Sequence, residues 1–494
     1  MKKKILVFLM SMFLIISSVA CSNNSAEVNK ETKVVQEKNE EKKETNVVEK
    51  EEKETANEKH EEKNEKTKSS KDINVVYISA SKLRVREDIT TTSKVVGDIL
   101  KGKKVDILEE KTDEEGNLWY KVEYEPDKTG WIFAKYTVTD LKEILSADLK
   151  NIDLDPIEKN LNIEGNERIK VKGVYVTRNS AVGKNLDYLL ELVEKTEINT
   201  FVIDVKDDYG AMLFETKAAA KYNPIANKKA ITKDINALMT KLKEKNVYTI
   251  ARIVSFKDPL YTNAHLDKAI MKKGTNIPFK SSDGLRWASP HDRDLWNYNI
   301  GVAKEAAKAG FNEIQFDYVR FPASNGGKLD ASLDYRNPLN ESKPETIQKY
   351  LKYAREELKD SNVYIGSDVF GLVGSVTDHM GIGQHWEAMS NASDIICPMM
   401  YPSHYGSGVY NLKTPDAKPY ETVYKSTYDS IKRNENLETP AIIRPWIQDF
   451  TASWVKGHIR YGKEEVKAQI KALNDLGIEE YMLWNAANKY SLYK

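Results

Sequence analysis

The sequence predicts an α/β protein whose larger part is a (β/α)8 TIM barrel, preceded by a small all-β domain. Two patterns support this prediction. From about residue 170 to the end, eight short apolar runs alternate with helical patterns, and the region before them carries closely spaced strand patterns separated by turn residues. Because the chain has 494 residues, more than one folded domain is expected.

The N-terminus has the form of an export signal. Lysines at 2–4 precede an apolar stretch at 5–16, which is shorter than a usual membrane span. Small residues then precede Cys21, and this SVAC sequence resembles a bacterial lipoprotein processing site. The resemblance implies a signal peptide at 1–21, lipidation of Cys21, and the membrane as a partner through that anchor. An ordinary secretory peptide cut nearby is the alternative. Either places the protein at the extracellular face of a bacterial cell membrane or in the cell wall.

Residues 22–71 consist mostly of Glu, Lys, Asn, Thr and Val, with no Phe, Trp, Tyr, Gly or Pro. Such a segment buries too little apolar surface to offset its conformational entropy. Glu and Lys also recur at helical spacing. The segment is therefore interpreted as a disordered or helical tether.

Residues 72–140 carry the all-β pattern, with turn residues at Lys101-Gly102 and Glu115-Gly116. The region resembles the bacterial SH3 domain, and the matching pieces are LRVR at 83–86, VG at 96–97, KG at 101–102, WYKV at 119–122 and GWI at 130–132. The resemblance implies a module that binds cell-wall peptide or glycan. The alternative for Trp119 and Trp131 is that they simply fill a small core.

After a connector at 141–169, strands and helices alternate through the barrel domain at 170–494. Strands are predicted at 171–177, 200–205, 248–254, 313–318, 363–368, 394–400, 441–447 and 480–484. Helices are predicted between them at 186–193, 235–243, 296–309, 346–358, 379–389, 424–431 and 466–476. A doubly wound sheet is less favoured, because no glycine-rich phosphate loop is present. No helix follows the last strand, and residues 141–145 are expected to cover its place.

Two aspartates at the ends of neighbouring predicted strands are the candidate catalytic residues. Asp317 ends the fourth strand and Asp368 ends the fifth, and barrel enzymes carry their active sites at these ends. Neighbouring strands lie about 4.8 Å apart. The two carboxylates could therefore approach the separation of about 5 Å that retaining glycosidases need. One acid would protonate the leaving oxygen, while the other attacks or activates water.

Other polar and aromatic residues at the strand ends are candidates for binding sugar. Aromatic faces stack on pyranose rings, and Arg, Asn and Gln bind hydroxyl groups. Asp204 is a rival for either catalytic role, or alternatively an inward-facing partner of Arg252. The candidate set is Asp204, Arg252, Tyr318, Arg320, Tyr401, His404, Arg444, Gln448, Trp484 and Asn488.

The barrel resembles a glycoside hydrolase domain family of bacterial exported proteins that was formerly a domain of unknown function. The matching stretches are FVIDVKDDYG at 201–210, EIQFDYVRFP at 313–322, SDVFG at 367–371, PMMYPSHY at 398–405, RPWIQDF at 444–450 and LWNA at 483–486. The family is similar to α-amylase-like barrels, whose strand-four Asp is the nucleophile, and this role would fall on Asp317. Those relatives often use a Glu on strand five as the acid, where this chain has Asp368.

The sequence therefore predicts a surface-anchored glycoside hydrolase that acts on a cell-wall or surface polysaccharide. A non-catalytic glycan-binding lipoprotein on the same scaffold is the alternative. A metal-dependent deacetylase is less favoured, because no metal-ligand spacing is present. No metal or other cofactor is expected. No nucleic-acid partner is expected either, because 75 basic and 75 acidic residues leave a formal net charge of zero. Cys397 is predicted to be a core residue.

Overall fold

The computed structural model describes residues 74–323, 325 and 327–493. The predicted signal peptide with Cys21, and the predicted tether at 22–71, lie outside these residues. Among the described helices, none combines the length and apolar character needed to cross a membrane.

The N-terminal folded part is all β, as predicted, and resembles an SH3 barrel. Its strands form two antiparallel sheets, in the orders β4-β1-β8 and β3-β2-β7-β6-β5. Their bounds are β1 (Val75–Ile78), β2 (Lys82–Arg86), β3 (Val95–Leu100), β4 (Lys104–Asp106), β5 (Glu109–Thr112), β6 (Leu118–Glu125), β7 (Lys128–Phe133) and β8 (Thr137–Val138). Trp119 and Trp131 are both buried. Their burial agrees with the interpretation that they fill the core.

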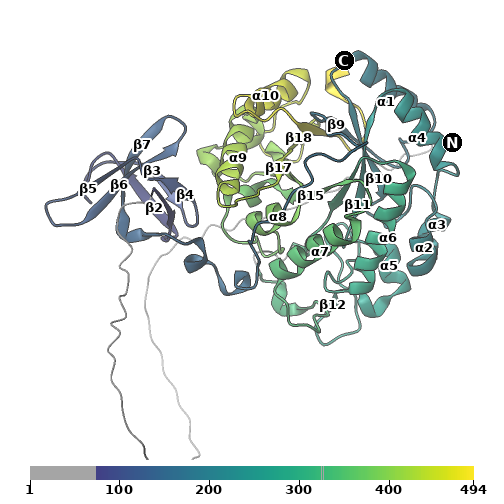
Figure 1. Cartoon of the computed structure of the whole chain (residues 1–494), viewed down its shortest axis with the longest axis horizontal. Coiled ribbons are helices and arrows are strands. Elements are labelled where there is room, and N and C mark those ends of the chain that lie inside the picture. Colours follow the sequence, from purple (N-terminus) through teal and green to yellow (C-terminus); the bar gives the residue numbers. More distant parts are fainter. Residues whose placement is uncertain (1–73, 324, 326, 494) are drawn as a thin grey trace, which may run out of the picture. The chain divides into compact units, whose positions relative to one another are not determined.

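From residue 172 onward, eight parallel strands close into a barrel, which confirms the predicted fold class (Figure 1). Their bounds are β9 (Lys172–Val176), β10 (Thr200–Lys206), β11 (Tyr248–Val254), β13 (Glu313–Asp317), β15 (Tyr364–Phe370), β16 (Ile395–Met400), the broken seventh strand β17 (Ile442–Ile443) and β18 (Trp446–Gln448), and β19 (Tyr481–Trp484). Pairing of β19 with β9 closes the barrel. The strand sequences are nearly continuous apolar runs because both faces of the sheet are covered.

Helices surround the strands (Figure 1). They are α1 (Lys184–Lys195), α2 (Lys217–Tyr222), α3 (Pro224–Lys228), α4 (Ile235–Glu244), α5 (Pro259–Ala264), α6 (Arg293–Ala309), α7 (Lys343–Leu358), α8 (Trp386–Ala392), α9 (Pro419–Asn434) and α10 (Lys463–Asn474). Local sequence sets their ends. Ser342 and Glu345 form a capping box at the start of α7, and Gly310 ends α6 in the left-handed conformation. A small antiparallel two-stranded sheet of β12 (Met271–Lys272) and β14 (Leu333–Asp334) joins the loops that follow β11 and β13.

The connector runs from the N-terminus of α7, where Ser342 donates to the carbonyl oxygen of Asp148, to the N-terminal end of the barrel, opposite the strand ends that carry the site. The Asn166 side-chain amide donates hydrogen bonds to the carbonyl oxygens of Asn312 (2.8 Å) and Asn362 (2.7 Å), which precede β13 and β15. The expectation that residues 141–145 cover the place of an eighth helix is wrong. The turn at Leu141–Ile144 contacts β8, whereas the C-terminal turn at Ser491–Tyr493 packs against α10.

Candidate active site

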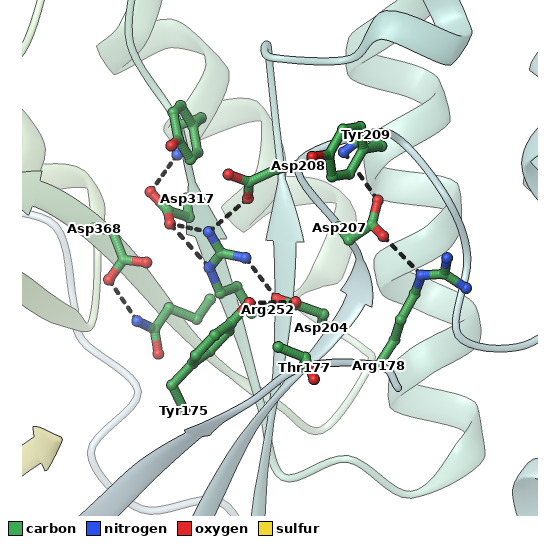
Figure 2. A network of polar contacts seen from close by, with 12 residues as sticks. Tyr175, Thr177, Arg178, Asp204, Asp207, Asp208, Tyr209, Arg252, Asp317 and Asp368 are labelled. Atoms are coloured by element: carbon green, nitrogen blue, oxygen red, sulfur yellow. Dashed lines mark hydrogen bonds and ion pairs between the residues drawn. The ribbon is translucent and has the colours of Figure 1, made fainter. Parts of the chain in front are cut away.

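The register of the sheet brings charged side chains on four neighbouring strands to one end of the barrel. Asp204 on β10 pairs with Arg252 on β11. The last paired residues of β13 and β15 come just before Asp317 and Asp368, so these two aspartates stand at the same level on adjacent strands. All four side chains lie near the C-terminal ends of their strands, where barrel enzymes carry their active sites. Figure 2 shows them together.

Arg252 is the centre of this cluster. Its guanidinium is buried and contacts three carboxylates (Figure 2). Nη1 donates to Oδ1 of Asp204 at 2.5 Å, and Nη2 donates to Oδ1 of Asp208 at 3.1 Å. Nε and Nη2 both donate to Oδ2 of Asp317, at 2.9 and 2.5 Å. Both donors bind the same oxygen, so Arg252 fixes the position of Oδ2 of Asp317 by two charge-assisted hydrogen bonds.

Asp204 uses both carboxylate oxygens to hold its neighbours. Oδ1 accepts from Arg252, and Oδ2 accepts from the Tyr175 hydroxyl at 2.6 Å. Burial raises the pKa of Asp204 to about 7, against the opposing effect of the Arg252 guanidinium. These contacts agree with the interpretation of Asp204 as an inward-facing partner of Arg252. Asp204 therefore positions Arg252, which in turn positions Asp317.

Asp208 sits between two cations at the rim of the cluster. Its carboxylate contacts Arg252 and, at 3.4 Å, Nζ of Lys257. Burial acts to raise the pKa of Asp208, but Arg252 and Lys257 outweigh it and hold the pKa below its usual range. Lys257 also forms an ion pair with Asp283 at 2.8 Å. Alternating charges therefore border the C-terminal end of the barrel, which we call its mouth, on the side of β10 and β11.

Asp368 has a different environment from Asp317, although the two are neighbours. It is 1 % exposed, and its Oδ1 accepts hydrogen bonds from Nε2 of Gln315 (2.5 Å) and Nε1 of Trp446 (2.7 Å). Within the described residues, its Oδ2 has no hydrogen-bond partner. Burial, and next the charge of Asp317, raise the pKa of Asp368 well above its usual range. Because Oδ1 already accepts from two donors, a proton bound by this carboxyl group would lie on Oδ2.

Backbone strain accompanies the cluster at Tyr318. Its φ is +47°, in the left-handed region that bulky residues rarely adopt. Its N–H donates to Oδ1 of Asp317 at 2.5 Å, so the strained turn helps to orient that carboxylate. Such a conformation costs on the order of 1–3 kcal/mol and is concentrated at functional sites. Trp287 packs edge-on against the Tyr318 ring at 5.6 Å and holds the turn in place.

Arg320 is held by aromatic rings on the same side of the mouth. Its guanidinium carbon lies 4.7 Å from the Trp287 ring centre, 5.1 Å from Tyr318 and 4.7 Å from Phe370. Its Nη1 donates to the carbonyl oxygen of Phe321 at 2.9 Å. Burial lowers the pKa of Arg320. The three rings hold the Arg320 guanidinium by cation–π contacts at this side of the site.

An aromatic wall lies on the β16–β19 side. Trp484 stacks on Tyr175 with ring centres 4.0 Å apart, and Trp446 meets it edge-on at 5.5 Å. Tyr401 lies 6.3 Å from Trp484, and the Arg252 guanidinium carbon lies 5.5 Å from it. The predicted Tyr401 and Trp484 therefore border the charged cluster. His404 is exposed and lies beyond Tyr401, with ring centres 5.3 Å apart.

Arg444 does not belong to this group, and its assignment to substrate binding is corrected here. Its Nη1 donates to both carboxylate oxygens of Glu313 at 2.8 Å, and its Nε donates to Glu480 at 2.7 Å. Glu313 begins β13 and Glu480 precedes β19. Arg444 therefore joins strands at the N-terminal end of the barrel. The sequence prediction put it at the C-terminal end of the seventh strand, because the break in that strand was not predicted.

Gln448 and Asn488 are also corrected, because their side chains are fully used in holding loops. Gln448 accepts from the N–H and hydroxyl of Ser403, and its amide donates to Asp416 and to a backbone carbonyl. Asn488 donates to the carbonyl oxygen of Tyr175 and accepts from Thr177. Both residues shape the mouth without presenting a free polar group to it.

Sequence reasoning did not select the two residues that bind Asp368. Gln315 stands two positions before Asp317 and faces the same side of the strand, so strand alternation within 313–322 was a usable signal. Trp446 lies in the RPWIQDF stretch at the end of the seventh predicted strand, but no role was predicted for it. Tyr175 and Asp208 also lie at the ends of predicted strands, where polar residues are candidates for the site.

No group of three His, Cys, Asp or Glu side chains is arranged to hold a metal ion among the residues that the structure describes. In the cluster of Asp204, Asp208 and Asp317, the charge between the carboxylates is supplied by Arg252.

Comparison with known families identifies both folded parts. The model of a family described as "Putative glycosyl hydrolase domain" matches residues 173–490. The chain belongs to this family. A model described as "Bacterial SH3 domain" matches residues 81–138. Both assignments confirm the resemblances found in the sequence. The barrel that carries Asp317 and Asp368 is thus a glycosyl hydrolase-type domain.

Solved structures with similarity to the chain include a hypothetical protein from Ruminiclostridium thermocellum ATCC 27405, at 29 % identity over 42 % of this chain and 98 % of that one, with a TM-score of 0.35. The PgaB (BpsB) glycoside hydrolase domain from Bordetella bronchiseptica matches at 13 % identity, 65 % and 95 % coverage, and a TM-score of 0.46. The α-galactosidase TtGalA from Thermus thermophilus matches at 10 % identity, 78 % and 72 % coverage, and a TM-score of 0.42. No curated protein matches the chain.

Proposed function

We propose that the barrel is a glycoside hydrolase that cleaves a cell-wall or surface polysaccharide, with Asp368 as the acid/base and Asp317 as the nucleophile or cation stabiliser. One observation carries the proposal. Two neighbouring carboxylates have opposite environments, since Arg252 binds Asp317 as an ion pair while burial raises the pKa of Asp368. A protonated acid beside a fixed carboxylate is the arrangement that glycosidic bond cleavage requires.

The reaction follows from these positions. The proton on Oδ2 of Asp368 passes to the glycosidic oxygen as the bond to the anomeric carbon breaks. The Asp317 carboxylate then bonds to the developing cation at that carbon. Asp368, now ionised, takes a proton from water, which attacks the anomeric carbon and releases Asp317. Because the two residues stand at the same level on adjacent strands, a short separation and net retention of configuration are favoured.

Access to the acid requires movement of the side chains around it. Asp317 and Asp368 are 3 % and 1 % exposed, so a substrate reaches Oδ2 of Asp368 when neighbouring groups at the mouth shift. Closing around the sugar again would exclude water and strengthen the electrostatic contacts inside. Tyr318, Arg320, Tyr401 and Trp484 border the cluster and are the proposed sugar contacts, with His404 farther out.

Surface anchoring and wall binding are part of the same proposal. The support comes from the sequence, where the SVAC pattern ends at Cys21 and the tether follows, and from the match to the bacterial SH3 domain. In this arrangement the lipid on Cys21 anchors the protein, and the tether gives the barrel reach into the wall. The SH3-like domain would bind wall peptide or glycan near the substrate.

Release of reducing ends from a panel of purified bacterial wall and surface polysaccharides tests the proposal. The full-length protein is compared with Asp317→Asn and with Asp187→Asn, a control on the surface of α1. Release that the control retains and Asp317→Asn loses would support the assignment. Equal release by the parent and Asp317→Asn would refute the role of Asp317.

The alternative is a non-catalytic glycan-binding protein, which the low exposure of both aspartates favours. It predicts glycan binding that survives in an Asp317→Asn, Asp368→Asn double variant, with no reducing ends released by the parent protein. Binding measured by calorimetry beside the release assay separates the two functions.

A further inference from the structure

A line of aromatic rings runs from the acid Asp368 to the surface. Trp446, which donates to Asp368, meets Trp484 at 5.5 Å between ring centres. Trp484 lies 6.3 Å from Tyr401, and Tyr401 lies 5.9 Å from Phe450. Phe450 stacks on Trp454, with ring centres 6.1 Å apart and planes 17° apart. We call these five rings the aromatic track.

The inner rings of the aromatic track are buried or partly buried, with Tyr401 5 % exposed, and only the outermost of the five rings is exposed. Trp446 is 1 % exposed, Trp484 and Phe450 are partly buried, and Trp454 is 52 % exposed. Tyr401 follows β16, Trp446 begins β18, Trp484 ends β19, and the other two rings lie in the loop after β18; these strands are neighbours in the barrel. The track therefore begins at the proposed catalytic acid and ends at a tryptophan that presents most of its face to solvent.

The chemistry of the track identifies its occupant. Trp454 offers an exposed apolar face, and Phe450 and Trp484 are partly exposed, whereas Trp446 and Tyr401 lie buried behind them and support the surface. Pyranose rings have apolar faces and hydroxyl rims that match such a surface. Exposed His404, 6.3 Å from Phe450, adds a polar ring beside the track. Continuity with Asp368 through Trp446 points to the substrate itself rather than to a separate partner.

We propose that the aromatic track is an extended subsite for uncharged pyranose units of the substrate chain, with Trp454 as its outer platform. The inference rests on the proposed function and specifies its substrate class, a polymer that is recognised several units from the bond that breaks. A short oligosaccharide would occupy the mouth without reaching Trp454. Affinity for a long oligosaccharide should therefore depend on Trp454, while affinity for a short one should not.

Calorimetric titration tests this dependence on chain length. The full-length Asp317→Asn protein is used so that hydrolysis does not interfere, and the probes are chitohexaose, cellohexaose and maltohexaose with their disaccharides. Adding Trp454→Ala to this protein should weaken binding of whichever hexasaccharide binds by about tenfold, which corresponds to about 1.4 kcal/mol. Binding of the disaccharide should change by less than about twofold. Trp454→Phe should restore part of the affinity, and Leu266→Ala, an exposed apolar control after β11, should have no effect.

The outcomes separate this inference from the proposed function. Unchanged hexasaccharide affinity in Trp454→Ala, equal losses for both chain lengths, or no binding of any hexasaccharide to the parent would each overturn the aromatic track. If Trp454→Ala weakens binding of the hexasaccharide alone, and the wild-type protein releases no reducing ends, the aromatic track is supported as a binding site and the proposed hydrolase function is rejected. Circular dichroism confirms that each variant is folded.

Discussion

The Arg252→Gln substitution removes the guanidinium that joins Asp204, Asp208 and Asp317 at the mouth of the barrel. Four hydrogen bonds of 2.5 to 3.1 Å are lost, and at least two buried carboxylates are left without their cation. Removing one partner of a buried ion pair costs about 3–5 kcal/mol of stability. Because Asp317 also loses its orientation, kcat/KM should fall by about 10²- to 10³-fold, as for other preorganised electrostatic groups.

Arg444→Gln is the matched control, because Arg444 is equally buried and binds Glu313 and Glu480 at the opposite end of the barrel. Its loss should destabilise the fold by a similar amount, about 3–5 kcal/mol, with little change in kcat for the folded fraction. The two arginines thus separate a structural ion pair from one that positions a reacting group.

Urea unfolding, followed by tryptophan fluorescence, measures the free energy of unfolding of both variants. Reducing-end release from the polysaccharide found in the substrate screen measures kcat and KM. In Arg252→Gln the stability loss should shrink as pH falls, since the stranded carboxylates then take up protons. Equal losses of kcat in the two variants, or full activity in Arg252→Gln, would refute the assignment of Arg252 to the active site.

Four further predictions concern the same end of the barrel. Asp368→Asn should abolish cleavage of natural glycans but spare aryl glycosides with very acidic leaving groups, since these need no proton; equal losses on both would exclude the acid role. Burial raises the pKa of Asp368 in the folded protein above its unfolded value of about 3.9. As pH rises from the unfolded pKa toward the folded pKa, the free energy of unfolding should fall by up to about 1.4 kcal/mol per pH unit, because the unfolded chain loses this proton first. Urea unfolding across this window should show a shallower decline in Asp368→Asn, and an unchanged slope would contradict the shift. Arg320→Lys should raise KM more than it lowers kcat, because the ammonium lacks the planar fork that the rings hold, and steady-state kinetics would show the reverse if Arg320 acted in the chemical step. Gly210→Ala should cost about 2 kcal/mol or more in thermal unfolding, because its φ is +83° and a Cβ would lie 2.0 Å from Oδ1 of Asp258; a smaller cost would mean that this buried carboxylate can move.

The elements that sequence periodicity predicted well are those whose burial is continuous. The second and third barrel strands, predicted at 200–205 and 248–254, are buried at every position of β10 and β11, so an apolar run marked each of them. The seventh strand was predicted as one run at 441–447, whereas Arg444 and Pro445 divide it into β17 and β18. Proline has no N–H to donate to the ladder, and a hydropathy pattern does not register that loss.

For the site, the sequence determined which residue types stand at the strand ends. The position of Asp317 after an apolar strand, and of Asp368 one strand later, already predicted two carboxylates at one end of a barrel. The alternation of strands and helices determined the barrel itself, because each apolar run must be covered on both faces. The family motifs lie at these same strand ends.

Only the tertiary structure decided what each side chain contacts. Arg252 and Arg444 are both arginines on barrel strands, yet one binds Asp317 at the mouth and the other binds Glu313 at the opposite end. The difference arises from register between strands that are distant in sequence. The same register places Gln315 and Trp446 on one oxygen of Asp368 and leaves the other without a partner among the described residues. Burial and neighbouring charge, which set the pKa of a carboxylate, are properties of that three-dimensional packing.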